Sequence, residues 1–211
     1  MVVLWSRIHA DENAGENAGE NESLLSYAER ARAARFATDD LRRRYVAAHA
    51  FVRRALAAHT GADAAALRFD AGAFGKPQLI DFPQVHFNLS HSGDWALCVI
   101  SDDGPVGVDI EVVRPLDEHD DLAARFFSAA EYDALVALSE EQQVFTFFEI
   151  WTKKEAYVKA TGRGLAQPLQ DFSVPISAGH ETVQPEGRWR VRAIEAPTGY
   201  AAAICTAAPT R

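Results

Sequence analysis

Residues 85–113 read VHFNLSHSGDWALCVISDDGPVGVDIEVV and contain three short segments of strand character. In the first, Val85, Phe87 and Leu89 alternate with polar residues, which is the pattern of a half-buried strand. Gly-containing turn signals at 92–94 and 102–105 separate the three segments. This stretch therefore predicts three strands, 85–90, 95–100 and 106–113, joined as an antiparallel meander.

The residues before the meander have helical character. Apolar residues recur at helical spacing over 24–36 and again after the capping sequence Thr38-Asp39-Asp40, and Gly61 follows as a C-terminal signal. Residues 2–8 favour a short strand. The tract 12–20 repeats Glu-Asn-Ala-Gly without apolar anchors, so we expect a flexible loop there.

The second half of the chain repeats this plan. Ser128 and Glu131 form a capping-box pattern that predicts a helix to residue 138, and a longer helix is expected over 141–160. Strands are expected at 172–174, 189–194 and 200–205. The run 200–206 resembles 95–101, so we predict an α+β fold made by pseudo-twofold duplication. Its two similar halves, 1–104 and 105–211, would each pack antiparallel strands on helices. The active site would lie in the cleft between the two halves.

Composition excludes several classes of protein. The net charge of −9 argues against nonspecific nucleic-acid binding, which needs a basic surface. The two cysteines are too few and too far apart for a disulfide framework or a zinc site. The chain has no apolar run of membrane-spanning length and no signal-peptide pattern, so we expect a reduced, cytoplasmic protein with no membrane partner. The internal duplication favours a monomer.

The segment Gly107-Val108-Asp109-Ile110-Glu111 is the strongest local signal for chemistry. On a strand, Asp109 and Glu111 project from the same side, opposite the apolar Val108 and Ile110. Two carboxylates so placed repel each other unless a cation lies between them. Taken alone, they could also be ordinary acids on a solvent-facing strand.

The predicted helix 141–160 carries a second group of this kind. Trp151, Glu155 and Lys159 are spaced by one turn and share a face. By itself this is also a common surface ion pair beside a packed tryptophan. If Glu155 meets Asp109 and Glu111, however, the three carboxylates would form an all-oxygen site of the kind that Mg²⁺ prefers.

Five stretches in order resemble the 4′-phosphopantetheinyl transferase superfamily, of the type that activates surfactin synthetase. They are FGKP at 74–77, FNLSHS at 87–92, GVDIE at 107–111, FFSAAE at 126–131 and WTKKEAYVK at 151–159. The resemblance covers about residues 23–175. It implies an enzyme that moves the 4′-phosphopantetheine group of coenzyme A to a serine of an acyl- or peptidyl-carrier protein, releasing 3′,5′-ADP.

The resemblance also implies roles for individual residues. The metal ligands would be Asp109, Glu111 and Glu155, the catalytic residues Glu155 and Lys159, and the coenzyme A contacts Arg32, Arg44, Lys76, Ser90, His91 and Lys159. Mg²⁺ is the expected cofactor, although Mn²⁺ is not distinguished from it. Where relatives often have a basic residue one turn before Arg32, this chain has Glu29. The chain therefore departs from the family at the place expected to bind the 3′-phosphate of coenzyme A.

Three points remain open at this stage. Glu131 could be a helix cap or a functional acid of the family. Phe127, Val144 and Phe147 could receive a carrier helix or fill the core. The rival functions are a Mg²⁺-dependent pyrophosphate hydrolase acting on a nucleotide cofactor, which needs no carrier, and a non-catalytic binding module.

Overall fold

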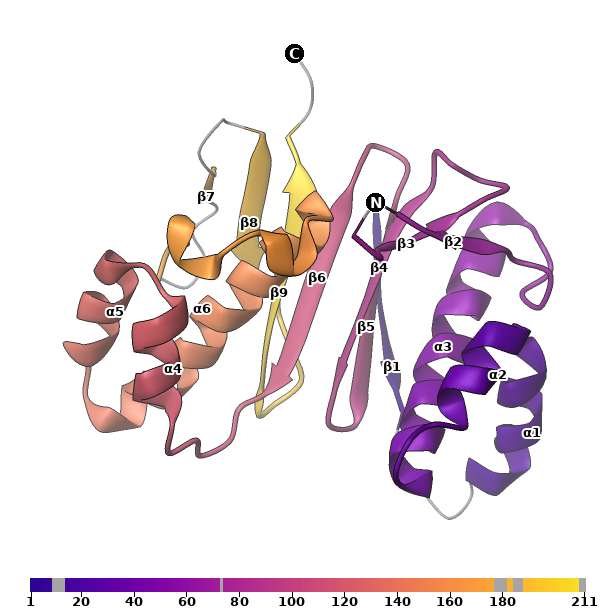
Figure 1. Cartoon of the computed structure of the whole chain (residues 1–211), viewed down its shortest axis with the longest axis horizontal. Helices are drawn as coiled ribbons and strands as arrows, with labels where there is room; N and C mark the ends of the chain where they lie inside the picture. Colours follow the sequence, from indigo (N-terminus) through magenta and orange to yellow (C-terminus); the bar gives the residue numbers. More distant parts are fainter. Residues whose placement is uncertain (9–13, 73, 177–181, 184–187, 209–211) are drawn as a thin grey trace.

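Two antiparallel sheets form the middle of the protein, with helices gathered on their outer sides (Figure 1). The computed structural model describes residues 1–8, 14–72, 74–176, 182–183 and 188–208. Its strands are β1 (Val2–Arg7), β2 (Phe69–Ala71), β3 (Pro77–Leu79), β4 (His86–Ser92), β5 (Trp95–Ser101), β6 (Val106–Val112), β7 (Thr182–Val183), β8 (Trp189–Ala193) and β9 (Tyr200–Ala207). Its helices are α1 (Ala14–Leu24), α2 (Tyr27–Ala33), α3 (Asp39–Thr60), α4 (His119–Phe126), α5 (Ala129–Val136) and α6 (Glu140–Thr161), followed by 3₁₀ turns at Gly164–Ala166 and Leu169–Asp171.

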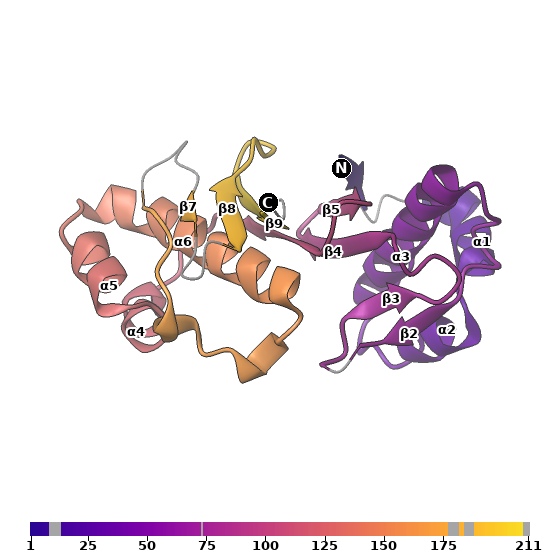
Figure 2. The same cartoon turned by 90° about the horizontal axis from the view of Figure 1, so that it is seen from above.

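The two sheets share one order of connection. In the first sheet the order is β1-β5-β4, and in the second it is β6-β9-β8-β7. In each sheet, the strand that comes first in the chain therefore pairs with the strand that comes last in the chain. In the parts of the chain that the structure describes, three α-helices separate the opening strand from the other strands of each sheet, one more than expected. Seen from above, α1–α3 and α4–α6 lie at opposite ends of the molecule (Figure 2). The predicted α+β duplication is confirmed.

The meander is correct for its first two strands and wrong for the third. Strands β4 and β5 pair antiparallel, with His86 opposite Ser101 and Ser92 opposite Trp95. Strand β6 instead pairs with β9, with Val106 opposite Thr206 and Val112 opposite Tyr200. Local turn signals place a chain reversal but do not select between two possible partners for the strand that follows.

Two other local expectations are wrong. Residues 14–20 belong to helix α1, and residues 12–13 of the expected loop lie outside the described part. Arg54 and Arg42 on α3 bind Glu20 and Glu22 of α1, so tertiary ion pairs favour a helix there. Residues 172–174 form no strand, because their backbone groups bind side chains: the Val174 N–H donates to Glu131 and the Phe172 carbonyl accepts from Lys154.

The apolar alternation of the central strands has the predicted consequence. Val85 and Phe87 are buried under α3 in one core cluster, whereas Val106, Val108 and Ile110 are buried in another with residues of β5 and β9. Helices α3 and α6 both end at a glycine with positive φ, Gly61 and Gly162, as the sequence pattern predicted for Gly61.

Helix α6 packs directly on β6 at Gly107. A Cβ atom at this position would lie 2.2 Å from the Ala156 carbonyl oxygen and 2.4 Å from the Ala160 nitrogen. Only a residue without a side chain permits this approach. Because Gly107 shares a face of β6 with Asp109 and Glu111, the contact brings α6 against the acidic face.

We expect Gly107→Ala to destabilise the fold by about 1–3 kcal/mol or more, because the methyl group must push α6 away from β6. Urea unfolding followed by circular dichroism measures the change. Gly19→Ala on α1 is the matched control, since its Cβ meets nothing within 4 Å, and it should be neutral or stabilising. Equal unfolding midpoints for the two variants would contradict the close approach.

Glu29, which stands where relatives often have a basic residue, has a structural role, because it joins α2 to α3. Its carboxylate accepts two bonds from the fully buried Arg53, at 2.9 and 2.7 Å, and lies 3.2 Å from His49. It also completes a capping box with Ser26. Burial alone would raise the pKa of Glu29, but the bonds from His49, Arg53 and Ser26 lower it to about 2.

A lowered carboxyl pKa stabilises the fold above the unfolded-state pKa of 4.5, and the contribution is lost as the pH falls toward 2. We therefore expect Glu29→Gln to cost about 3 kcal/mol at pH 7 and clearly less at pH 3. Denaturant unfolding at both pH values tests this. Glu20→Gln, which removes an exposed pair with Arg54, should cost under about 1 kcal/mol. A pH-independent loss in Glu29→Gln would contradict the assignment.

Candidate active site

A buried carboxylate lies at the contact between β6 and α6. The Asp109 residue is 2% exposed, and its Oδ1 lies 2.5 Å from Lys159 Nζ on α6. Ser90 on β4 donates to the same oxygen at 2.8 Å and accepts from Lys159 at 3.2 Å. The acidic face of β6 is therefore covered by α6 and is not an ordinary solvent-facing edge.

The other Asp109 oxygen, Oδ2, is buried and has no hydrogen-bond partner in the described structure. Buried carboxylate oxygens normally have a partner, because an unpaired one loses its hydration without compensation. An orphaned oxygen beside a second carboxylate is available to a cation or a substrate proton.

Glu111 and Glu155 join Asp109 electrostatically. Burial raises the pKa of each of the three carboxyls, and for Glu111 and Glu155 the charge of Asp109 raises it further. Glu155 also raises the pKa of Glu111, while Lys159 lowers the pKa of all three. The site therefore holds more negative charge than the single ammonium of Lys159 balances.

The donor set fits a magnesium ion held in part by substrate. Among the described residues, no group of three or more His, Cys, Asp or Glu is arranged to hold a metal on its own. Mg²⁺ commonly takes only one or two protein carboxylates and completes its shell with water and substrate phosphates. The orphaned oxygen of Asp109 and the neighbouring Glu111 meet that smaller requirement.

A cavity of about 780 Å³ opens beside these residues. Glu155, Lys159 and Trp151 line it from α6, which confirms that they share one helix face. The rest of its wall comes from both halves of the chain: Phe74, Gly75, Lys76, Pro77, Asn88, Arg125, Phe126, Val158, Gly162, Gly164, Gln167, Pro168, Leu169 and Gln170. A second cavity, of about 520 Å³, shares Phe74, Lys76, Pro77 and Gly162 with the first.

Lys76 lies between the two cavities and binds backbone. Its ammonium donates to the carbonyl oxygens of Val106 and Lys159, both at 2.7 Å, and reaches that of Ala160 at 3.4 Å. Burial lowers its pKa to about 8. The residue thus ties the 74–77 segment to the end of α6, a role that the sequence did not reveal.

The residues expected to contact the nucleotide part of coenzyme A are only partly brought together. His91 is exposed at the end of β4, and its pKa is lowered by partial dehydration and then by His49, Lys159 and Arg44. Arg44 binds Asp40 at 2.8 Å and Asp94 at 2.9 Å, so its charge is already paired. Arg32 lies on the exposed side of α2, over the ring of Tyr45.

Sequence reasoning missed a buried ion pair behind the site. Lys154 and Glu131 are 0% and 2% exposed and lie 2.7 Å apart. Lys154 also donates to the carbonyls of Leu169 and Phe172, so the pair fastens the segment that forms one wall of the cavity. Glu131 caps α5 as well, through the box with Ser128. The available signal was a lysine pair within the otherwise apolar face of the predicted helix.

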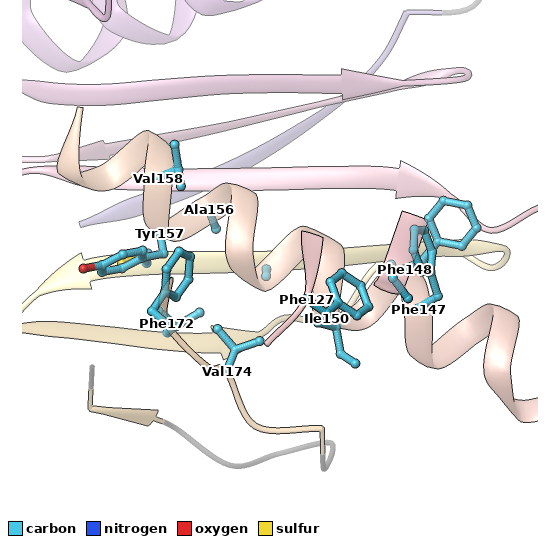
Figure 3. Close-up of a cluster of buried hydrophobic side chains, with 14 of the residues drawn as sticks. Phe127, Phe147, Phe148, Ile150, Ala156, Tyr157, Val158, Phe172 and Val174 are labelled. Carbon is cyan, nitrogen blue, oxygen red and sulfur yellow. The ribbon is translucent and has the colours of Figure 1, made fainter. Parts of the chain in front are cut away.

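The apolar residues considered for carrier docking belong largely to the core. Phe127 and Phe147 are 3% and 2% exposed and belong to one buried cluster (Figure 3). Their rings stack on each other, and the half-buried Val144 packs against the same cluster. Of the two alternatives left open for these residues, Phe127 and Phe147 therefore fill the core. Val136 on α5 and Phe145 on α6 are instead exposed, at 43% and 48%.

Two further expectations concern the cysteines and the possibility of a membrane-spanning helix. Cys98 and Cys205 are both buried and free, and burial raises the pKa of each thiol to about 12. No helix in the described ranges combines the length and apolar character needed to cross a membrane.

Comparison with known proteins agrees with this geometry. A sequence model of the 4′-phosphopantetheinyl transferase superfamily matches residues 105–205, and one of the 4′-phosphopantetheinyl transferase N-terminal region matches residues 18–102. A 4′-phosphopantetheinyl transferase of Bacillus subtilis is 36% identical over 189 residues, covering 88% of this chain and 83% of the relative.

Other relatives extend the comparison. The 4′-phosphopantetheinyl transferase Sfp of Bacillus subtilis strain 168 is 33% identical and covers 89% of this chain and 84% of its own. HetI of Nostoc is 40% identical over 72% of this chain and 65% of its own. The Thermotoga maritima holo-[acyl-carrier-protein] synthase structure overlaps 50% of this chain and 64% of its own with a TM-score of 0.39 and 18% identity. The identity and coverage of the Bacillus relatives show that this chain belongs to the 4′-phosphopantetheinyl transferase superfamily.

Proposed function

We propose that the protein transfers the 4′-phosphopantetheine group from coenzyme A to a serine of an acyl- or peptidyl-carrier protein and releases 3′,5′-ADP. The observation that carries this proposal is the buried Asp109–Lys159 pair, with an orphaned carboxylate oxygen, beside a cavity lined from both halves. The names of the relatives support the same activity.

Asp109 and Glu111 would hold a divalent ion, Mg²⁺ by the chemistry of the ligands, and Glu155 would face that ion from α6. When bound, the ion supplies positive charge against the pyrophosphate of coenzyme A. Lys159 adds a cation whose ammonium already stands at Asp109. Ser90, His91, Lys76, Arg44 and Arg32 would contact the nucleotide end, and for Lys76 and Arg44 this requires that existing bonds to protein groups be shared or exchanged.

The transfer displaces one oxygen by another at phosphorus. The carrier serine oxygen forms a bond to the β-phosphorus as the bond to the 3′,5′-ADP oxygen breaks, and the serine proton leaves for Glu155, directly or through a water. Burial raises the pKa of Glu155 in the metal-free protein, whereas a bound cation would lower it and make the carboxylate a weaker base, which favours transfer through a water. Lys159 balances charge on the departing ADP.

Further features of the proposal concern the protein as a whole. We infer that residues 1–104 and 105–211 form two related halves, that the enzyme acts as a monomer in the cytoplasm, and that its carrier docks near Val136 and Phe145. The equal topology of the two sheets supports the first of these inferences.

Incubation of the protein with coenzyme A, Mg²⁺ and several apo-carriers tests the function by intact-mass analysis. We expect the carrier to gain the phosphopantetheine mass and 3′,5′-ADP to form only when carrier is present. Glu155→Gln should lower turnover by about 10²–10⁴-fold, because it removes the base. Glu140→Gln, at the exposed first turn of the same helix, is the matched control.

The rival pyrophosphate hydrolase makes the opposite prediction. Release of 3′,5′-ADP at the same rate without carrier would support hydrolysis and overturn the transferase proposal. Near-normal turnover in a folded Glu155→Gln variant would remove Glu155 from the catalytic step while leaving the activity in place.

Arg125 is expected to face the carrier, since it lines the cavity and lies over the ring of Phe126. Carrier proteins of this kind are typically acidic, so Arg125→Glu should raise the carrier KM with little change in the KM for coenzyme A. Arg192→Glu, on the exposed side of β8, is the control. An unchanged carrier KM in Arg125→Glu would place the docking surface elsewhere.

A further inference from the structure

Strands β4 and β6 run side by side without a backbone ladder. They belong to different sheets, and side chains of β4 accept the hydrogen bonds from the facing amides of β6. The pairs are Val108 N–H to Asn88 Oδ1 at 2.8 Å, Ile110 N–H to Ser90 Oγ at 3.4 Å and Val112 N–H to Ser92 Oγ at 3.1 Å. The constant separation of 20 residues means that the two strands run parallel and in register.

The two serines of this seam also reach the acidic residues. Ser90 donates its hydroxyl hydrogen to Asp109 at 2.8 Å, and Ser92 donates to Glu111 Oε2 at 2.8 Å. A serine hydroxyl has one hydrogen and two lone pairs. Because a β6 amide occupies a lone pair of each oxygen, the hydroxyl hydrogen is directed toward the carboxylate.

The two carboxylates differ in what else holds them. Asp109 binds Lys159 as well as Ser90. In the described part of the chain, Ser92 is the one hydrogen-bond donor to the Glu111 side chain. The orientation of Glu111 therefore depends on a single hydroxyl that comes from the other half of the chain.

We propose that Ser92 is a positioning residue, whose hydroxyl, held by the Val112 amide, orients the Glu111 carboxylate toward the divalent ion. The inference rests on the proposed function, in which Glu111 is a metal ligand. It adds that the affinity for the ion depends on contact between the halves, because Ser92 belongs to β4 and Glu111 to β6. Partners that orient a metal ligand typically affect metal affinity by about 10–100-fold.

Ser92→Val and Ser92→Thr form a matched pair for the test, since both are β-branched and only threonine keeps a hydroxyl. Calorimetric titration with Mn²⁺, in the presence of coenzyme A and without carrier, measures the dissociation constant of the ion. We expect Ser92→Val to weaken Mn²⁺ binding by about 10–100-fold and Ser92→Thr to remain near the original protein.

Ser101→Ala controls for the loss of a strand serine, since Ser101 is buried and Ser92 is half-buried. Ser101 is the last residue of β5, and its hydroxyl oxygen accepts a hydrogen bond from the Asp103 amide at 3.1 Å. It takes no part in the hydrogen bonds described between β4 and β6. This variant should keep the original Mn²⁺ affinity, even if its unfolding midpoint falls as far as that of Ser92→Val. A purely structural role for Ser92 predicts that stability and Mn²⁺ affinity change together in all the variants.

The outcomes separate the two proposals. Equal Mn²⁺ affinity in Ser92→Val and Ser92→Thr would overturn the positioning role even if transfer to carrier proceeds. Absence of transfer in the original protein, with Mn²⁺ binding that still depends on the Ser92 hydroxyl, would overturn the proposed function and support the positioning role. Failure of the original protein to bind Mn²⁺ would overturn both.

Discussion

The close contact between helix α6 and strand β6 at Gly107 is the constraint on which the site depends. It removes the space that a side chain would need and presses the acidic face of β6 onto the helix. Asp109 is buried as a result, and Lys159 reaches it from α6. The same contact places Glu155 near enough to perturb the pKa of Glu111. A wider spacing would leave these groups in water, where their charges interact weakly.

Burial leaves the negative charge of this site without enough positive charge to balance it until a cation binds. Three carboxyls with raised pKa values face one ammonium, and one buried oxygen lacks a partner. Such a site is costly in the free protein and becomes favourable when positive charge enters. A cation accompanied by a pyrophosphate suits it well, because the phosphates complete the shell of the ion and the nearby basic groups balance the phosphates.

Buried charges elsewhere in the protein serve its architecture. Arg53 is fully buried and joins Glu29 of α2 to α3, while Lys154 is fully buried and joins Glu131 to the segment along the cavity wall. Lys76 bridges from the first half to the end of α6 in the second. Each of these charges anchors an irregular or short segment whose apolar surface is small. Polar anchors with defined geometry hold such segments in one position, at the cost of dehydrating the charges.

The sequence by itself determined the family and most of the elements, although it predicted a loop in place of part of α1 and a strand at 172–174 that does not form. Alternation marked the faces of β4 and β6, the capping sequences marked the starts of α3 and α5, and the ordered motifs identified the transferase type. These signals are local, because they record which face of an element is apolar and where its backbone groups need a cap. Only the tertiary structure decided that β6 pairs with β9, that Glu29 binds Arg53, and that serines of β4 hold the acids of β6. Those choices join residues that lie far apart in the chain, and a local pattern states that a polar group needs a partner without stating which one it will meet.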